Sequence, residues 1–205
     1  MTIPLVVGVS GKMGVGKDYL IDTVIKPMFQ EAGLNVAVLG FADQIKVNAA
    51  AQAGLEISRM FGDKTPEIRR MLQVAGTEQG RDVHGPDVWV NIVAKWIEIR
   101  AMRDQTQVFI IPDCRFRNEL AWIKRQPNHL VLRIEAPKRN LARLKKEAPE
   151  GNLEAISQHP SEIDLDGLDP DQFNLVYNND GVGVDKFRAS WSQLVSSSIA
   201  PVHEA

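Results

Sequence analysis

The sequence predicts a three-layer α/β fold around a five-stranded parallel sheet. Apolar segments of strand length alternate along the 205-residue chain with segments of helical periodicity. Residues 3–39 contain a strand, a glycine-rich loop, a helix and a second strand, which is a βαβ unit with an expected right-handed crossover. The strands are apolar on both faces, as buried parallel strands usually are. These features predict one domain over residues 1–205.

Each element is assigned from its hydrophobic pattern and its flanking residues. The expected strands are Ile3–Val9, Val36–Leu39, Val108–Ile111, His129–Ile134 and Asn174–Tyr177. The expected helices are Lys17–Ala32, Asp43–Gln79 with a break near Gly62–Pro66, Asp87–Arg103, Asn118–Gln126 and Lys186–Ser198. Residues 137–173 are rich in charge and contain several prolines, so this stretch is expected to be the least rigid.

The composition is that of an ordinary globular protein, with 44% hydrophobic and 24% charged residues. The net charge of −2 shows no basic excess, so a nucleic-acid partner is not expected. No signal-type segment and no apolar run of membrane-spanning length is present, which favours a cytoplasmic protein without membrane contact. The single cysteine, Cys114, excludes an intramolecular disulfide and a thiolate metal cluster.

The strongest local motif is the glycine-rich segment Gly11–Asp18, which follows the first strand directly. It matches the pattern GxxxxGK[ST] at every position except the last. Glycines let successive backbone N–H groups point at phosphate oxygens, and the following helix adds its positive end. The alternative is a glycine-rich turn without a ligand. The residues expected to bind nucleotide phosphates are Gly11, Lys12, Gly14, Val15, Gly16, Lys17, Asp18 and Tyr19.

Two aspartates are candidate Mg²⁺ ligands. Asp18 stands where the motif normally has serine or threonine, and its carboxylate could hold the ion directly or through water. Asp113 follows the apolar strand Val108–Ile111, at the sheet edge where phosphate-transferring sites keep an acidic residue. The alternative for Asp113 is a structural role as a helix cap.

Arginines gather in two segments that should border the same edge of the sheet. Arg115 and Arg117 follow the strand that precedes Asp113, and Arg69 and Arg70 lie on an earlier helix. The planar guanidinium group pairs with two phosphate oxygens at once, so this set could clamp a second phosphate. Any one of these residues could instead be a solvated surface group.

Other residues have two interpretations. Trp89 could stack on a base or pack in a helix core. His159 and Glu162 are spaced as a metal pair, but without a third ligand nearby a zinc site is not expected.

Five segments, in order along residues 5–195, resemble phage deoxynucleoside monophosphate kinases. They are Gly16–Asp18, Arg69–Thr77, Ile111–Arg115, His159–Glu162 and Tyr177–Gly181. Animal phosphomevalonate kinase is similar at the first and third of these segments. The resemblance implies a P-loop kinase fold of the nucleoside monophosphate kinase type, with strand order 2-3-1-4-5 and a mobile lid within residues 137–165.

The resemblance also assigns roles to individual residues. Lys17 and the amides of Gly14 and Gly16 would hold the donor phosphates, and Asn179–Gly181 would lie under the donor adenine. Within the lid, Arg139 and Arg143 are candidate phosphate contacts. The residues on the family's acceptor positions are Arg70, Gln73, Trp89, Asp113, Arg115 and Glu119. Four residues would take part in catalysis, namely Lys17, Arg70, Asp113 and Arg115.

The predicted reaction is transfer of the γ-phosphoryl group of ATP, with Mg²⁺, to a deoxynucleoside 5′-monophosphate. Small-molecule nucleotides are the expected partners, and a homodimer is possible. Three alternatives stay open: a kinase of another phosphorylated small molecule such as phosphomevalonate, a phage kinase of hydroxymethylated bases in DNA, and a nucleotide-binding regulatory module without transfer activity.

Overall fold

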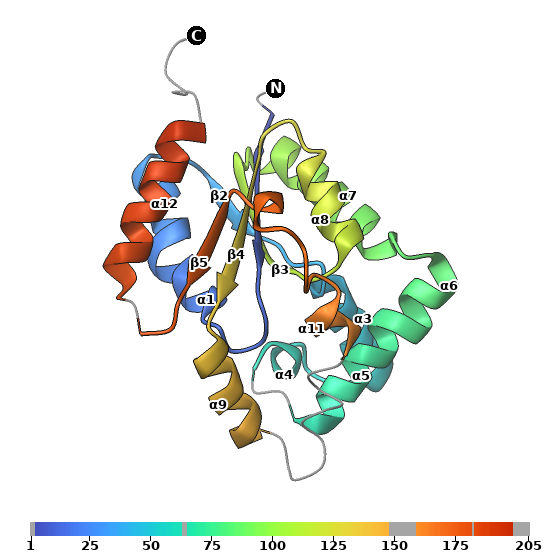
Figure 1. The fold of residues 1–205 in the computed structure, drawn as a ribbon. Helices are drawn as coiled ribbons and strands as arrows, with labels where there is room; N and C mark the ends of the chain where they lie inside the picture. The colour runs from blue at the N-terminus through green and yellow to red at the C-terminus, as the bar shows by residue number, and fades with distance from the viewer. Residues whose placement is uncertain (1–2, 63–64, 148–158, 182, 199–205) are drawn as a thin grey trace.

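A computed structural model describes residues 3–62, 65–147, 159–181 and 183–198. Its centre is a five-stranded sheet with the order β2-β3-β1-β4-β5 (Figure 1), in which each neighbouring pair is parallel. The strands are β1 (Leu5–Ser10), β2 (Val36–Val38), β3 (Val108–Cys114), β4 (His129–Glu135) and β5 (Leu175–Asn178). The predicted fold class and strand order are therefore confirmed.

Helices cover both faces of the sheet, which makes the three layers (Figure 1). One face packs against α1 (Lys17–Leu20), the π-helical turn Ile21–Ile25, α2 (Lys26–Glu31) and α12 (Val184–Ser198). The other packs against α7 (Val88–Arg103) and α8 (Arg117–Lys124). The side chains of β1 alternate between the two cores, with Val7 and Val9 in one and Val6 in the other, as the twofold periodicity of a strand requires.

A group of helices between β2 and β3 forms a lobe beside the carboxyl edge of the sheet (Figure 1). It contains α3 (Asp43–Ala53), α4 (Ser58–Phe61), α5 (Pro66–Gly76), the π-helical turn Thr77–Arg81 and α6 (Asp82–His84). Its small cores are built from α3 and α5 with Trp89, and from Met60 with Ile68. This lobe replaces the single broken helix expected over Asp43–Gln79.

Strand β3 is longer than expected, because it continues through Pro112 to Cys114. A proline cannot donate to a neighbouring strand, and central strands tolerate it mainly at an irregularity. The register between β1 and β3 shifts here, between Gly8 and Ser10 of β1. The shift lets the strand carry Asp113 and Cys114 to the edge of the sheet.

The stretch expected to be least rigid contains two α-helices and the 3-10 turn Pro170–Gln172 in its described parts. Helix α9 spans Pro137–Glu147 and α11 spans Pro160–Ile163 (Figure 1). The asparagine–aspartate turn after β5 holds the start of α9, since the Asp180 carboxylate accepts the N–H groups of Lys138 and Arg139 at 2.7 and 3.1 Å. Residues 148–158 of the predicted lid lie outside the described residues.

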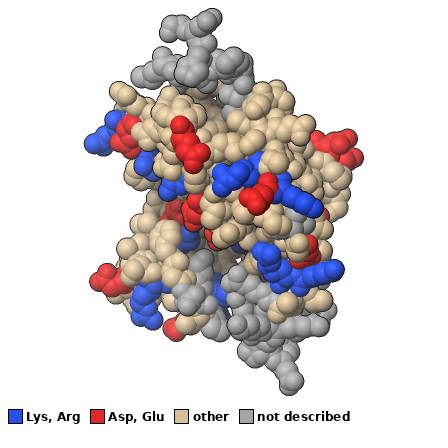
Figure 2. Space-filling view, turned by 90° about the vertical axis from the view of Figure 1, so that its left-hand side faces the viewer, with Lys and Arg blue, Asp and Glu red and all other residues tan. Residues whose placement is uncertain are grey.

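Within the described part of the chain, the helices are too short or too polar to cross a membrane. Figure 2 shows lysine, arginine and acidic side chains interspersed on one face of the molecule, without an extended basic surface there. The mixed charge agrees with the small net charge of the sequence.

Candidate active site

The glycine-rich loop lies at the carboxyl end of β1, between β3 and β4. Gly11, Gly14 and Gly16 all have positive φ angles, of 145°, 79° and 92°. L-residues with side chains rarely adopt such angles, so these glycines allow the chain to curl between β1 and α1. The loop predicted from the sequence therefore has the curled backbone that phosphate binding requires.

Lys17 is buried inside this loop, with 8% of its surface exposed. Its Nζ donates to the carbonyl oxygens of Gly11 and Lys12 at 2.7 and 3.0 Å. Burial, and next the nearby Arg115 guanidinium, lower the pKa of Lys17 from 10.5 to about 8. The Lys17 ammonium group is thus held at the centre of the loop, where a bound anion would stabilise its positive charge.

The turn after β5 packs directly on the loop. Asn179 is buried, and its Nδ2 donates to the Val15 carbonyl at 2.8 Å. Arg139 of α9 donates to the Asn179 carbonyl at 3.1 Å. A Cβ atom on Gly16 would lie 2.6 Å from Asn179 Nδ2 and 2.9 Å from Arg139 Nη1, so only glycine fits there. The structure brings Asn179 and Arg139 to the loop, whereas the side chain of Arg143 lies outside the described residues.

Asp113 points from the end of β3 to the turn before α3. Its two carboxylate oxygens accept the N–H groups of Phe41 and Ala42, each at 2.9 Å. A side chain on Gly40 would collide with this carboxylate, at 2.9 Å from Oδ2. Both oxygens therefore serve a structural contact, which is the alternative that the sequence left open for this residue.

Arg115 follows β3 and lies beside the loop. Its Nη1 forms an ion pair with Oε1 of Glu162, a residue of α11. The other oxygen of Glu162 accepts the Met13 N–H of the loop at 3.0 Å. A single carboxylate thus connects the loop to the arginine predicted to bind the acceptor phosphate.

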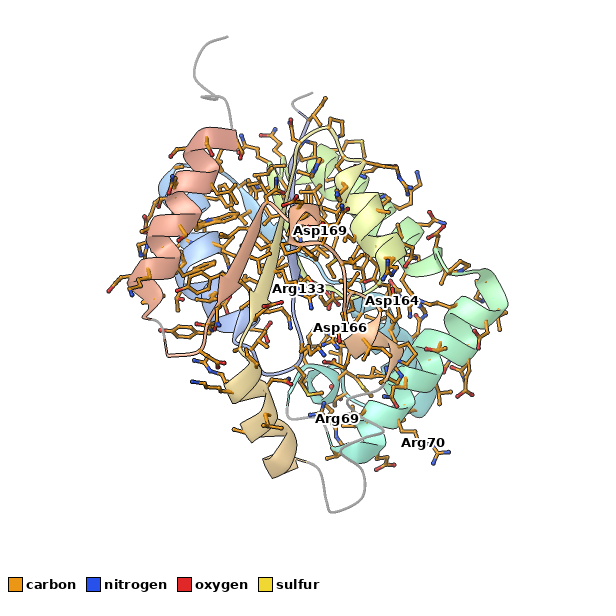
Figure 3. The ribbon with its side chains drawn as sticks, viewed as in Figure 1. Arg69, Arg70, Arg133, Asp164, Asp166 and Asp169 are labelled. Carbon is orange, nitrogen blue, oxygen red and sulfur yellow. The ribbon has the colours of Figure 1, made fainter. Side chains whose placement is uncertain are left out.

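Helix α5 brings Arg69, and not Arg70, to the loop. Arg69 Nη1 lies 3.2 Å from Met13 Sδ. Arg70 is exposed and points away from the loop (Figure 3). It borders an open groove of ≈ 320 Å³ between α3 and α5. Successive residues of a helix are rotated by about 100°, so the two arginine side chains point in different directions. Gln73 is exposed one turn after Arg69, on the same face. The predicted acceptor role of Arg70 therefore fits Arg69 better.

Trp89 belongs to the core of the helical lobe in this structure. Only 4% of its surface is exposed, and its Nε1 donates to the Gly76 carbonyl at 2.8 Å. Its ring lies so close to Gly80 that a side chain there would collide with it. The indole therefore occupies the core position that the sequence left open as the alternative to stacking on a base.

Glu119 is buried and stabilises the start of α8. Its Oε2 accepts the N–H groups of Arg115 and Phe116 at 2.8 and 3.0 Å, and its Oε1 pairs with Arg81 at 3.0 Å. Burial raises the pKa of Glu119 to about 7, more than these donors lower it. The Arg81 guanidinium also covers the Phe116 ring at 4.1 Å. Glu119 therefore orients the backbone of Arg115.

The other predicted loop residues border the site. Asp18 and Tyr19 are exposed on the first turn of α1, and Lys12 Nζ pairs with Asp166 at 2.6 Å. Among the described residues, no group of three or more His, Cys, Asp or Glu side chains is arranged to hold a metal ion. Asp18 is exposed beside Lys17, so its carboxylate fits Mg²⁺ that is otherwise held by phosphate oxygens and water. Asp113 fits the ion less well because two amides occupy its oxygens.

A family model described as phosphomevalonate kinase matches residues 9–129, which include the loop, α5 and the end of β3. The chain belongs to the phosphomevalonate kinase family. No curated protein matches the sequence significantly. The closer resemblance to phage deoxynucleoside monophosphate kinases stays a prediction.

Solved structures confirm the P-loop kinase fold of this phosphomevalonate kinase family member. The crystal structure of APE1195 is 16% identical with a TM-score of 0.53, covering 98% of this chain and 99% of that one. TT1252 from Thermus thermophilus is 18% identical with a TM-score of 0.53, covering 94% and 97%. Shikimate kinase from Acinetobacter baumannii is 15% identical with a TM-score of 0.50, covering 96% and 94%.

Several residues of the site were not predicted from the sequence. Arg81 and Arg133 are partly buried arginines held by acidic partners, and no local motif marks them. Asn140 of α9 donates to the Met13 carbonyl at 2.6 Å across 127 residues of sequence. Glu162 lies in the segment His159–Glu162 that resembles the phage kinases, and this resemblance is the signal that could have marked it.

Proposed function

We propose that this protein transfers the γ-phosphoryl group of ATP to a small acceptor that already carries a phosphate, and that the acceptor is a deoxynucleoside 5′-monophosphate. The observation that carries the proposal is the position of Arg115. Its guanidinium pairs with the Glu162 carboxylate that also accepts the Met13 N–H of the loop, and Arg69 contacts the Met13 side chain. The loop and Lys17 suffice for a donor, so further cations next to the loop favour a second phosphate.

The chain's own residues supply positioning and charge neutralisation. Amides of the loop and the Lys17 ammonium would hold the β- and γ-phosphates of ATP, with Mg²⁺ near Asp18 neutralising further charge. Arg115 and Arg69 would hold the acceptor phosphate. Its oxygen is already anionic, so no general base is required for the attack.

Two features favour a nucleotide as the acceptor. Five motif segments resemble the phage nucleotide kinases, in order along nearly the whole chain. The helical lobe between β2 and β3 also places the exposed amide of Gln73 on the face of α5 that carries Arg69, where it could read a base. Because Trp89 is buried, recognition of the base would depend on polar groups rather than on this ring.

A phosphomevalonate-type acceptor is the second candidate, because the family match points to it. Such an acceptor has no base, so it requires the arginines but not Gln73. Both candidates share the donor site and the acceptor phosphate.

Product analysis tests the two candidates directly. The purified protein is incubated with ATP, Mg²⁺ and, separately, each deoxynucleoside monophosphate or phosphomevalonate, and the diphosphate product is identified by mass spectrometry. The Lys17→Ala variant is the control, and we expect it to lose at least ~10²-fold in kcat, as for the loss of one transition-state contact. Turnover of phosphomevalonate alone would exclude the nucleotide acceptor. No turnover of any acceptor would contradict the proposed function.

A further inference from the structure

A short acidic segment of the chain lies against the basic residues of the candidate site. It comprises Glu162 of α11 and the following Asp164 and Asp166, of which Figure 3 labels the two aspartates. Asp164 Oδ2 accepts the Arg117 N–H at 2.7 Å, at the start of α8. The segment is therefore attached both to the loop after β1 and to the residues after β3.

Glu162 makes the contacts that a phosphate would make. Its Oε2 accepts a loop N–H, that of Met13, at 3.0 Å, and its Oε1 pairs with the Arg115 guanidinium. Only 8% of the Glu162 side chain is exposed. A backbone amide of a phosphate-binding loop together with a guanidinium is a characteristic anion site. A carboxylate occupies it here.

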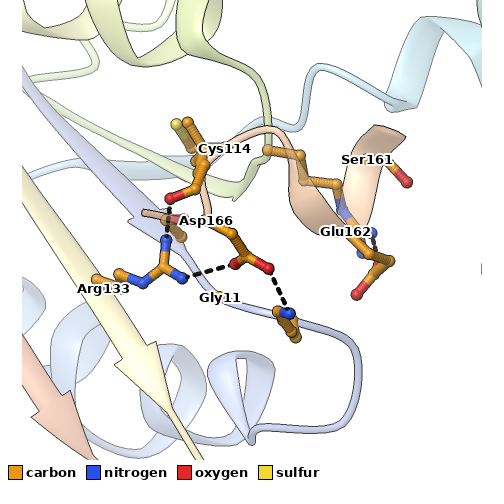
Figure 4. A pocket seen from close by; sticks show the side chains of 10 residues that line it. Gly11, Cys114, Arg133, Ser161, Glu162 and Asp166 are labelled. Atoms are coloured by element: carbon orange, nitrogen blue, oxygen red, sulfur yellow. Dashed lines mark hydrogen bonds and ion pairs between the residues drawn. The ribbon is translucent and has the colours of Figure 1, made fainter. Parts of the chain in front are cut away.

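Asp166 reinforces this arrangement on the other side of the loop. Its carboxylate pairs with Lys12 at 2.6 Å and with Arg133 at 3.2 Å (Figure 4). The cavity that remains between these residues, Glu162 and the loop measures ≈ 10 Å³. That volume holds about one water molecule. A phosphoryl group does not fit into this cavity beside Arg115 unless the segment moves.

We propose that Glu162 is a substitute anion, which holds Arg115 against the loop in the empty protein and is displaced when phosphate binds. Arg115 then exchanges one anionic partner for another. Binding of phosphate must replace the contacts of Glu162, so the carboxylate lowers the affinity of the site for phosphates while it positions the arginine. This inference rests on the proposed phosphate-binding loop, and not on which acceptor is used.

The test is binding of inorganic tripolyphosphate by calorimetry to the wild type and to Glu162→Gln. The amide keeps the size of the side chain but removes its charge, so the ion pair with Arg115 is lost. We expect the variant to bind about tenfold more tightly, the scale of one charge-assisted contact. Asp169→Asn is the matched control: Asp169 also lies in the segment after α11, but its carboxylate accepts the Asp171 N–H at 3.0 Å. The control should bind as the wild type does.

A gain of affinity separates the proposed role from a merely structural one, because loss of structural support would weaken binding. Weaker or unchanged binding by Glu162→Gln would overturn the inference, as would an equal gain in Asp169→Asn. If neither the wild type nor Glu162→Gln binds tripolyphosphate, the proposed function fails as well.

Hydrogen exchange of the wild type gives a second measurement that needs no variant. The backbone N–H groups of Glu162, Asp164 and Asp166 are bonded within the segment at 2.8, 2.9 and 2.8 Å. Displacement by tripolyphosphate should accelerate their exchange, whereas slower or unchanged exchange would contradict displacement.

Discussion

At the residue scale, Lys17 combines two properties that usually exclude each other. It is buried, and the role proposed for it requires a positive charge. In the free protein its Nζ is satisfied by two carbonyl groups of the loop rather than by an acid. Carbonyl oxygens stabilise the ammonium less than a phosphate would, which is why burial lowers the pKa to about 8.

This pKa makes nucleotide affinity depend on pH. Above about pH 8 the free protein loses the Lys17 proton, and a phosphate ligand must recover it on binding. We expect the affinity for ATP to fall by up to about tenfold per pH unit above that value. Calorimetry between about pH 7 and 9.5 measures this affinity on both sides of the lowered Lys17 pKa. Repeating the titration in two buffers of different ionisation enthalpy should detect the proton that is taken up on binding.

The stability of the free protein should rise over the same pH range in which the affinity for ATP falls. The pKa of Lys17 is lower in the folded state than its ordinary value of 10.5, so the unfolded chain binds more protons between about pH 8 and 10.5. This group therefore raises the free energy of unfolding as pH rises through that window. Lys17→Arg is the control for both predictions, because an arginine keeps its charge throughout this pH range. The affinity of this variant for ATP should not fall as the pH rises. If the ATP affinities of the variant and the wild type changed identically with pH, the prediction for Lys17 would be contradicted.

Residues whose roles follow from a local motif could be predicted from the sequence. The glycines of the loop and Lys17 are recognisable because the backbone geometry they require is encoded within eight residues, Gly11–Asp18. Trp89 could not be assigned in this way. A tryptophan on a helix fits both a core and a ligand site, and only the packing of Gly80 against its ring decides between them.

At the element scale, α5 shows why neighbouring residues of the same type are hard to separate by sequence. Arg69 and Arg70 are chemically identical, and the helix turns one towards the loop and the other towards solvent (Figure 3). The amphipathic pattern predicted that a helix forms here. The rotation of the helix relative to the loop depends on contacts with α3 that no local pattern encodes.

The two arginines therefore form a matched pair of variants. Arg69→Ala should raise KM for the acceptor by roughly tenfold or more with little change for ATP, because charge-assisted contacts contribute about 1.5–3 kcal/mol. Arg70→Ala removes the same charge from the same helix and should leave both constants near the wild-type values. Steady-state kinetics with each substrate varied in turn measures both. A larger rise of the acceptor KM in Arg70→Ala than in Arg69→Ala would instead support the acceptor role that the sequence predicted for Arg70.

At the scale of the whole molecule, the site forms where segments distant in sequence meet. Met13 is contacted by α5, by α11 and by Asn140 of α9. The sheet order explains this meeting, since β3 and β4 flank β1 and direct their carboxyl ends to the loop. The order was predictable from the resemblance, but contacts such as that between Met13 and Glu162, 149 residues apart, were not.

The last prediction concerns the connection between α9 and the donor site. Arg139 reaches from the first turn of α9 to the Asn179 carbonyl, beside Gly16. Because α9 is anchored to the turn after β5, this guanidinium is held next to the backbone that would contact the ATP phosphates. We expect Arg139→Ala to raise KM for ATP by about tenfold, the effect of one charge-assisted contact, while KM for the acceptor changes little.

Lys138→Ala is the control for this prediction, because it removes one positive charge from the adjacent position of α9. Both main-chain N–H groups keep their bonds to Asp180 in either variant, so the start of the helix is preserved. An equal rise of KM in the two variants would indicate a general effect of charge, and a rise confined to the acceptor would move Arg139 to the other side of the reaction. If Arg139 binds the donor, ATP should also raise the melting temperature of the variant less than that of the wild type, since stabilisation by a bound ligand grows with the logarithm of its affinity.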